Sequence, residues 1–178
     1  APRALAGRAL ENLTAYARLY GYVRFFHPSD EAADANWDEL GLSGIDAVEN
    51  VDSSAALARA LQKHFAQVAP TLRVVVTGQK PELDAALASP PAADAKTLAW
   101  EHLGCGLITG GRQSIYTSER KRSTKGGWLT GGEPHRNMPK VDAPWTVDLP
   151  GGVTAAVPLA VYVDRDGTLP RAATSESD

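Results

Sequence analysis

The spacing of hydrophobic and polar positions changes near residue 70. Between residues 5 and 26, apolar residues recur every three or four positions and form one stripe along a helix of about six turns. A second pattern of this kind covers Trp37 to Val48, and a third follows the cap sequence Asp52-Ser53-Ser54 and stops at Pro70. Three helices with short connections predict a small bundle that ends at about Pro70.

After Pro70 the apolar period changes from about 3.6 to 2, which is typical of strands. Residues 72–76 are mostly β-branched, and Trp100 and His102 lie in a second alternating run. Between these runs, residues 81–87 predict a short helix with proline in its first turn. Residues 104–140 are rich in Gly, Ser, Thr and Lys and predict long loops.

The clearest β pattern lies near the carboxyl end. Trp145, Val147 and Leu149 alternate, a Pro-Gly-Gly turn follows, and residues 153–163 then alternate regularly, which predicts a hairpin of half-buried strands. We interpret the Asp164-Arg165-Asp166-Gly167 sequence as a turn that closes the last hairpin, because the later ligands of a calcium loop are missing.

Together these patterns predict an α+β protein with an amino-terminal three-helix bundle followed by a mostly antiparallel β domain. The predicted divisions are a bundle at 1–70, a mainly β domain with one short helix at 71–165, and a tail or linker at 166–178.

Composition and charge exclude two classes of partner. Of the 178 residues 43% are hydrophobic and 22% charged, the formal net charge is −3, and this balance produces no field that would attract nucleic acid. The local basic run of Arg120, Lys121, Arg122 and Lys125 is interpreted as a solvated strand end or loop. No apolar stretch approaches the ~20 residues that span a bilayer, so we expect no membrane insertion.

No catalytic or metal site is predicted from the residues. Ser118 and Lys121 have the spacing of a Ser-x-x-Lys motif, but an extended chain would place their side chains about 10 Å apart. His102 and Cys105 provide two potential ligands, which is fewer than the four of a structural zinc site. The sequence contains no cofactor motif. An autonomous cysteine or metal hydrolase that uses Cys105, His102 and His135 stays as an alternative.

The stretch "YGYVRFFHPSDEAADANWDEL", residues 20 to 40, contains the candidate binding residues Arg24, His27 and Trp37. We expect Trp37 to cover the aromatic residues at the helix end, His27 to cap the last helical carbonyls, and Asp38 to accept from Arg24 or the neighbours of Trp37. A fourth candidate binding residue is Trp128, which glycines flank and which we expect to be exposed.

The same stretch, followed by "LARALQKHFAQVAPTLRV", resembles the helical region that precedes the catalytic core in bacterial tricorn-like and C-terminal-processing serine peptidases. The segments "WEHLGCG", "YTSER" and "VDLPGGVTAAVPLAVYVDRDGTLP" are similar to the β segment that follows. The matching helical positions are Tyr20, Gly21, Phe25, Phe26, His27, Pro28, Trp37, Asp38, Ala69, Pro70 and Thr71.

The resemblance implies a non-catalytic role for this chain. In that family the nucleophilic serine, at a Ser-Ala-Glu-like helix start, and the general-base lysine belong to a later domain, and no stretch here matches them. The implied partners are a downstream peptidase core in the same polypeptide and a peptide substrate, and the implied location is periplasmic or secreted. The Ala-Pro start and the polar end "LPRAATSESD" support the expectation of one piece of a longer protein.

A recognition module is the alternative from a different functional class. Trp100, Trp128 and Trp145, together with glycine-rich loops, have the composition of an aromatic platform for a peptide or a glycan. Against it, Trp100 and Trp145 alternate with strand neighbours and are expected in the protein core.

Overall fold

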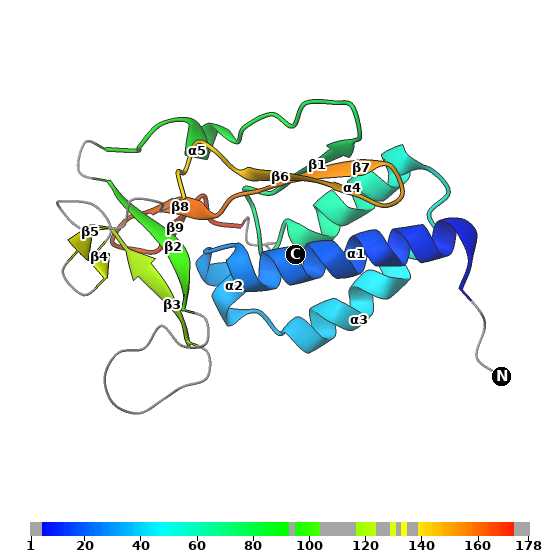
Figure 1. The fold of residues 1–178 in the computed structure, drawn as a ribbon, viewed down its shortest axis with the longest axis horizontal. Coiled ribbons are helices and arrows are strands. Elements are labelled where there is room, and N and C mark those ends of the chain that lie inside the picture. The colour runs from blue at the N-terminus through cyan, green and yellow to red at the C-terminus, as the bar shows by residue number, and fades with distance from the viewer. Residues whose placement is uncertain are drawn as a thin grey trace, which may run out of the picture.

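Helices form the amino-terminal part of the protein in the computed structural model. The structure describes residues 5–92, 95–103, 117–123, 129–130, 133–134 and 139–172. The prediction of an α+β fold is confirmed (Figure 1). The four helices before residue 70 are α1 (Gly7–Phe26), α2 (Asp30–Asp34), α3 (Trp37–Val48) and α4 (Ser54–Phe65).

Short polar side chains start three of these helices. Ser29, Asn36 and Ser53 each accept a hydrogen bond from a backbone N–H in the first turn of the helix that follows. The three long helices lie where the apolar spacing predicts them. The cap at Ser29 starts α2, an extra single turn that lies between the first two predicted helices.

The β residues form two antiparallel sheets and a small ribbon. Sheet A has the order β1-β7-β6, sheet B the order β3-β2-β8-β9, and β4 pairs with β5. The strands are β1 (Arg73–Val76), β2 (Lys96–Leu103), β3 (Thr117–Arg122), β4 (Leu129–Thr130), β5 (Glu133–Pro134), β6 (Trp145–Leu149), β7 (Val153–Val157), β8 (Ala160–Val163) and β9 (Thr168–Leu169).

The predicted strand over residues 153–163 is divided between the two sheets. β7 pairs with β1 and β6 in sheet A, whereas β8 pairs with β2 and β9 in sheet B. Pro158, which has no N–H to donate, lies at the break. All five residues of β7 are buried, so the expectation of a half-buried strand is wrong for this segment. β7 is the central strand, and its two faces are covered by different parts of the chain.

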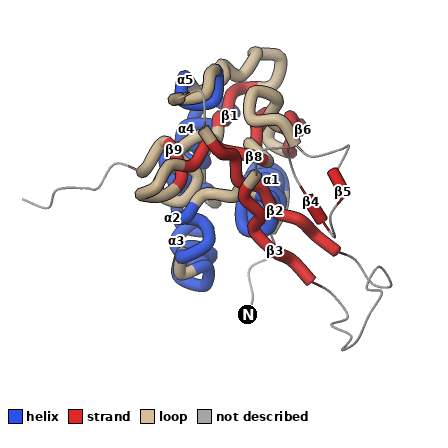
Figure 2. The backbone as a smooth tube through the Cα atoms, turned by 90° about the vertical axis from the view of Figure 1, so that its left-hand side faces the viewer, coloured by secondary structure: helices blue, strands red, loops and turns tan. Residues whose placement is uncertain are grey.

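Helices and sheet A share one hydrophobic core. Its buried residues come from α1, α3, α4, the segment between α4 and β1, and all three strands of sheet A. Figures 1 and 2 show α1 and α4 lying along one face of this sheet. The bundle is therefore not separated from the β region at residue 70 by a core of its own. A second cluster contains Leu87 and Val141 and packs against strands β2 and β8.

Two further segments differ from the sequence prediction. Residues 81–84 are not helical, and the helix α5 is limited to Ala85–Ala88, where the Asp84 side chain accepts from the N–H of Ala86 at 2.8 Å. At the carboxyl side, β9 lies inside the predicted tail, and the turn Asp164–Gly167 closes the β8–β9 hairpin as expected. No helix among the described residues meets the length and apolarity required to cross a membrane.

Candidate functional site

Arg24 and Trp37, two of the four predicted binding residues, meet at Tyr20. The Tyr20 hydroxyl donates to the backbone oxygen of Trp37 at 2.8 Å and accepts from the Arg24 guanidinium at 3.0 Å. The Trp37 ring lies edge-on to Tyr20 with 5.2 Å between centroids, and its Nε1–H donates to the oxygen of Ala32 at 2.9 Å. These contacts join α1, α2 and α3.

The expectation that Trp37 covers Phe25 and Phe26 is wrong. These two side chains are 54% and 41% exposed, and the ring that Trp37 contacts is that of Tyr20. At 3.6 residues per turn, Phe25 and Phe26 lie about 120–140° around the helix from Tyr20. A helix α3 packed beside Tyr20 therefore leaves both phenylalanines uncovered.

His27 is fully buried, and it uses both ring nitrogens. Nδ1 lies 2.9 Å from the Ser29 hydroxyl oxygen, and Nε2 lies 2.9 Å from that of Thr71. The Ser29 hydroxyl donates to the oxygen of Val68 at 2.6 Å, and this short bond assigns Nδ1–H as a donor to the hydroxyl and Nε2 as the acceptor from Thr71. The Ser29 N–H lies 3.4 Å from Nδ1, too long to compete with that assignment. The ring is neutral in this arrangement, and burial lowers its pKa from 6.5 to about 3.

The expectation that the His27 side chain caps the last helical carbonyls is therefore wrong. The backbone N–H of this residue does so instead, because it donates to the oxygen of Val23 at 3.1 Å. The ring connects the end of α1 to the α4–β1 connection through Thr71, 44 positions away in the chain.

Side chains of sheet B donate hydrogen bonds to the turn formed by residues 27–30, which we name the His-Pro corner. Trp100 Nε1–H donates to the oxygen of His27 at 3.2 Å, and Arg120 donates to that of Pro28 at 2.9 Å. Arg120 also pairs with Asp30. Arg120, one residue of the basic run, therefore makes structural contacts and is not part of a solvated strand end.

Asp30 is bound from a second direction by β9. Its backbone N–H donates to the Thr168 hydroxyl at 2.9 Å, and the Thr168 N–H donates back to its carboxylate at 2.8 Å. Burial acts to raise the pKa of Asp30, but the hydrogen bonds from Arg120 and Thr168 and the charge of Arg120 together lower it. The carboxylate therefore stays ionised and fixes the corner to β3 and β9, the two outer strands of sheet B.

Four aromatic residues, which we name the aromatic surface, lie at the end of α1 and the start of β6: Tyr22, Phe25 and Phe26 on the helix and Trp145 on the strand. Tyr22 and Trp145 meet edge-on with 4.7 Å between centroids. Phe26 packs edge-on against His102 of β2 at 4.9 Å. Trp145 is 41% exposed, so its expected place in the core is wrong; it is the first residue of the edge strand β6. Trp100 is partly buried.

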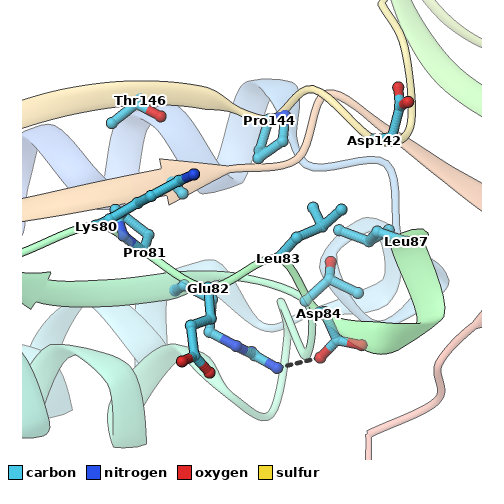
Figure 3. A pocket seen from close by; sticks show the side chains of 12 residues that line it. Lys80, Pro81, Glu82, Leu83, Asp84, Leu87, Asp142, Pro144 and Thr146 are labelled. Atoms are coloured by element: carbon cyan, nitrogen blue, oxygen red, sulfur yellow. Dashed lines mark hydrogen bonds and ion pairs between the residues drawn. The ribbon is translucent and has the colours of Figure 1, made fainter.

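A cavity of about 770 Å³ lies on the face of sheet A that points away from the helices (Figure 3). Its floor includes Arg73, Ala156 and Thr146, which are register partners across β1, β7 and β6. The neighbouring positions on these strands point into the helix-covered core. The apolar wall residues are Pro81, Leu83, Leu87 and Pro144.

The charged groups of the cavity have unequal roles. Arg73 donates to the backbone oxygens of Pro70 and Leu72 and pairs with Asp84, so it ties the wall segment to the sheet. Figure 3 shows Lys80 and Asp142 at opposite ends of the group of side chains that line the cavity. Thr71, which holds His27, also lines the cavity and connects it to the His-Pro corner.

The described residues form no Ser-Lys pair. Ser118 and Lys121 both lie on β3, where Lys121 contacts the carboxylate of Glu101 at 2.5 Å and Ser118 lies 2.8 Å from Nδ1 of His102. The extended spacing predicted for Ser-x-x-Lys is confirmed. Within the part of the chain that the structure describes, no group of three or more potential metal ligands occurs. Trp128, Cys105 and His135 lie outside the described residues.

Comparison with known proteins identified no match. No family model, no curated protein and no solved structure is significantly similar to this chain.

Sequence reasoning missed the cavity on sheet A. The alternation of residues 145–149 places Thr146 on the face opposite to Val147, but the wall comes from residues 80–87, more than 50 positions earlier. Only the pairing of β1 with β7 brings the two segments together.

Proposed function

We propose that this chain is the non-catalytic amino-terminal part of a serine peptidase of the tricorn-like and C-terminal-processing type. In this proposal it packs on a catalytic core in the same polypeptide or positions substrate for that core. The resemblance of residues 20–40 supports the family, and the observation that carries the binding role is the aromatic surface.

The aromatic surface has the chemistry of a protein contact. Phe25, Phe26 and Trp145 are each at least 41% exposed, and Tyr22 joins the tryptophan to the helix. Covering these exposed rings with a partner is favourable by about 25 cal/mol per Å² of apolar area buried. Aromatic side chains of this kind are also enriched among residues that dominate binding energy.

The His-Pro corner makes this surface rigid. Trp100, Arg120 and Thr71 fix the backbone and ring at His27 and Pro28, directly after Phe26. Little conformational entropy is then lost when a partner covers the aromatic rings, which favours tight binding.

The first test is to sequence the reading frame beyond residue 178. A downstream region with a serine at a Ser-Ala-Glu-like helix start and a later lysine is the expected result. A frame that ends near residue 178 overturns the proposal.

The second test measures peptidase activity of the intact polypeptide. The double variant Phe26→Ser and Trp145→Ser is expected to lower kcat/KM for an unstructured peptide at least about tenfold, because about 1.4 kcal/mol of contact energy corresponds to that factor. Leu5→Ser is the matched control, since Leu5 is 42% exposed but lies about 30 Å away along α1.

Two results would contradict the proposal. Equal activity in the double variant and the control shows that the aromatic surface contacts neither core nor substrate. Peptidase activity of residues 1–178 alone, lost in Ser118→Ala, makes the chain itself an enzyme.

The resemblance also leads us to propose a periplasmic or secreted location. Fractionation of the source cells followed by immunodetection is expected to find the protein outside the cytoplasm. Recovery with a cytoplasmic marker enzyme would contradict this.

The cavity on sheet A favours a second candidate function, an independent peptide- or glycan-recognition module. Its volume of about 770 Å³ lies in the range of ligand sites, and it combines apolar walls with Lys80 and Asp142 at opposite ends of its lining. The substitution Thr146→Trp would fill the floor from an exposed position and is expected to abolish binding to arrayed peptides or glycans. The absence of any wild-type binding across both arrays removes this candidate.

A further inference from the structure

A groove of about 490 Å³ lies between helix α4 and strand β1, and we name it the α4–β1 groove. Its lining comes from one face of α4, within residues 55–66, and from residues 74–79. β1 is an edge strand of sheet A, because the order is β1-β7-β6 and no strand of the described chain lies beyond it. The groove shares no lining residue with the cavity over sheet A.

The free edge of β1 presents backbone hydrogen-bonding groups to this groove. Thr77 N–H donates to the oxygen of Gly152 at 3.0 Å, which fixes the phase of the ladder between β1 and β7. Because the bonding direction alternates along an antiparallel ladder, Val74 and Val76 direct their N–H and C=O groups away from β7. A row of such groups is the template on which an extended peptide adds as a further strand.

The Gln62 side chain of α4 occupies part of this edge. Its Oε1 accepts from the N–H of Val74 at 2.8 Å, and its Nε2 donates to the oxygen of Leu72 at 3.0 Å. This amide offers one acceptor and one donor, as the backbone of a neighbouring strand would. At the far end of the edge, the Gln79 N–H donates to the oxygen of Val76 at 3.0 Å. The edge available to a second chain therefore extends from residue 72 to residue 76.

Both charged residues that line the groove are cations. Arg59 and Lys63 lie on α4 and are exposed, and neither has an ion-pair partner among the residues that the structure describes. The lining contains no Asp or Glu. The charge of the groove is therefore complementary to carboxylates.

The spacing of the two cations matches that of an extended chain. Arg59 and Lys63 are four residues apart, which is about 6 Å along a helix axis. Side chains two residues apart in a strand share one face and are separated by about 6.6 Å. Two acidic residues with one residue between them would thus face both cations. Ala55, Ala58 and Ala66 line the same face of α4 and leave room for these side chains.

We propose that the α4–β1 groove binds an extended peptide with acidic side chains at alternate positions. The peptide replaces the Gln62 amide and pairs with residues 72–76 as a fourth strand of sheet A. Its carboxylates contact Arg59 and Lys63. This proposal does not rest on the peptidase assignment, because it uses neither the aromatic surface nor any downstream region.

Isothermal titration calorimetry with a defined peptide tests the proposal. The probe is acetyl-Gly-Ser-Asp-Val-Asp-Ser-Gly-amide, and a dissociation constant on the order of 100 µM is expected at low salt. Replacing both aspartates by asparagine keeps the shape, removes the charge and is expected to weaken binding at least about tenfold. N-methylation of the three central residues removes their backbone donors and is expected to weaken it by a similar factor.

Variants of the protein test the role of the two cations. The double variant Arg59→Glu and Lys63→Glu is expected to lose the acidic peptide and to bind the same peptide with lysines in place of the aspartates. The matched control is Arg18→Glu with Lys140→Glu, which changes the net charge equally at two exposed positions outside the groove. This control is expected to retain the acidic peptide.

A further variant tests the displacement of the glutamine. Gln62→Ala is expected to bind the acidic peptide at least about threefold more tightly, because no amide has to leave the edge. Gln67→Ala removes an exposed glutamine that donates to the oxygen of His64 and does not line the groove, so its affinity is expected to be unchanged.

NMR locates the bound peptide. The amide resonances of Val74 and Val76 are expected to shift on titration, and those of Thr146 and Asp148 on the opposite edge strand are expected to stay in place.

Four outcomes would overturn the proposal. The absence of both heat and NMR shifts at about 1 mM peptide leaves the groove without this ligand. Equal binding of the N-methylated peptide shows attraction of carboxylates without strand pairing. Equal losses in the two double variants assign the effect to net charge. Weaker binding by Gln62→Ala shows that the peptide does not take the place of the amide.

Discussion

Phe26 and His27 are neighbours in sequence, yet they lie in opposite environments. The apolar ring of Phe26 is 41% exposed, and the polar ring of His27 is completely buried. His27 is stable inside because both nitrogens have partners, whereas the Phe26 ring packs against His102 and leaves part of its surface exposed to solvent. The difference teaches that polarity alone did not decide burial at the end of α1, because hydrogen-bond partners stabilise the polar ring inside while the apolar ring stays partly exposed.

The strongest way to break this comparison is to remove the buried ring. His27→Ala is expected to lower the free energy of unfolding by about 3–5 kcal/mol, because it leaves a cavity and removes the partners of Ser29 and Thr71. Urea denaturation followed by circular dichroism measures this. A loss below about 1 kcal/mol would show that the corner rearranges without cost.

The next largest effect on the free energy of unfolding is expected when the pH is lowered. The pKa of His27 is about 3 in the folded chain and 6.5 when the chain is unfolded, so between these values only the unfolded chain binds the proton. This contribution to stability is present above pH 6.5 and is lost as pH falls, by about 1.4 kcal/mol per pH unit, until about pH 3.

Denaturation curves at pH 7 and 4.5 measure how much the free energy of unfolding changes with pH in total. NMR of the ring reports the protonation of His27 alone. The His27 ring resonances are expected to stay those of a neutral Nδ1–H imidazole down to pH 4.5. A titration of these resonances near pH 6.5 would contradict the buried arrangement.

Thr71→Val sharpens the comparison by removing a single hydrogen bond while keeping a similar shape. It leaves Nε2 of His27 buried without its donor and is expected to cost about 1–3 kcal/mol. Thr71→Ser retains the hydroxyl and is the control in the same urea experiment. Equal losses in the two variants would assign the effect to the lost methyl packing.

The smallest effect is expected on the exposed side. Phe25 is 54% exposed, so Phe25→Ala should change the free energy of unfolding by less than about 1 kcal/mol. The same denaturation measurement applies. A loss comparable to that of His27→Ala would mean that the aromatic surface is part of the folded core.

Local signals in the sequence were sufficient for the positions of the long helices and several strands. The cap at Ser53 and the Pro-Gly-Gly turn act on residues that are close along the chain, so the pattern predicts them. The prediction fails at Pro158 because one alternating run continues through two different sheets. Alternation indicates an extended strand but does not specify which neighbour it pairs with.

The candidate sites were predicted less completely. Arg24 and Trp37 do share a network, but their common partner Tyr20 was not among the predicted binding residues. The roles of Thr71 and Arg120 at the His-Pro corner depend on contacts across 44 and 92 positions, which a single sequence does not display.

By itself, the sequence determined the positions of the three long helices, the α+β class and the concentration of aromatic residues at the end of α1. Only the tertiary structure decided that His27 is inside, that Phe25, Phe26 and Trp145 are outside, and that a cavity forms over Ala156. The physical reason is that caps, prolines and periodicity act within a few residues. Burial and hydrogen-bond satisfaction depend instead on which distant segments are packed together.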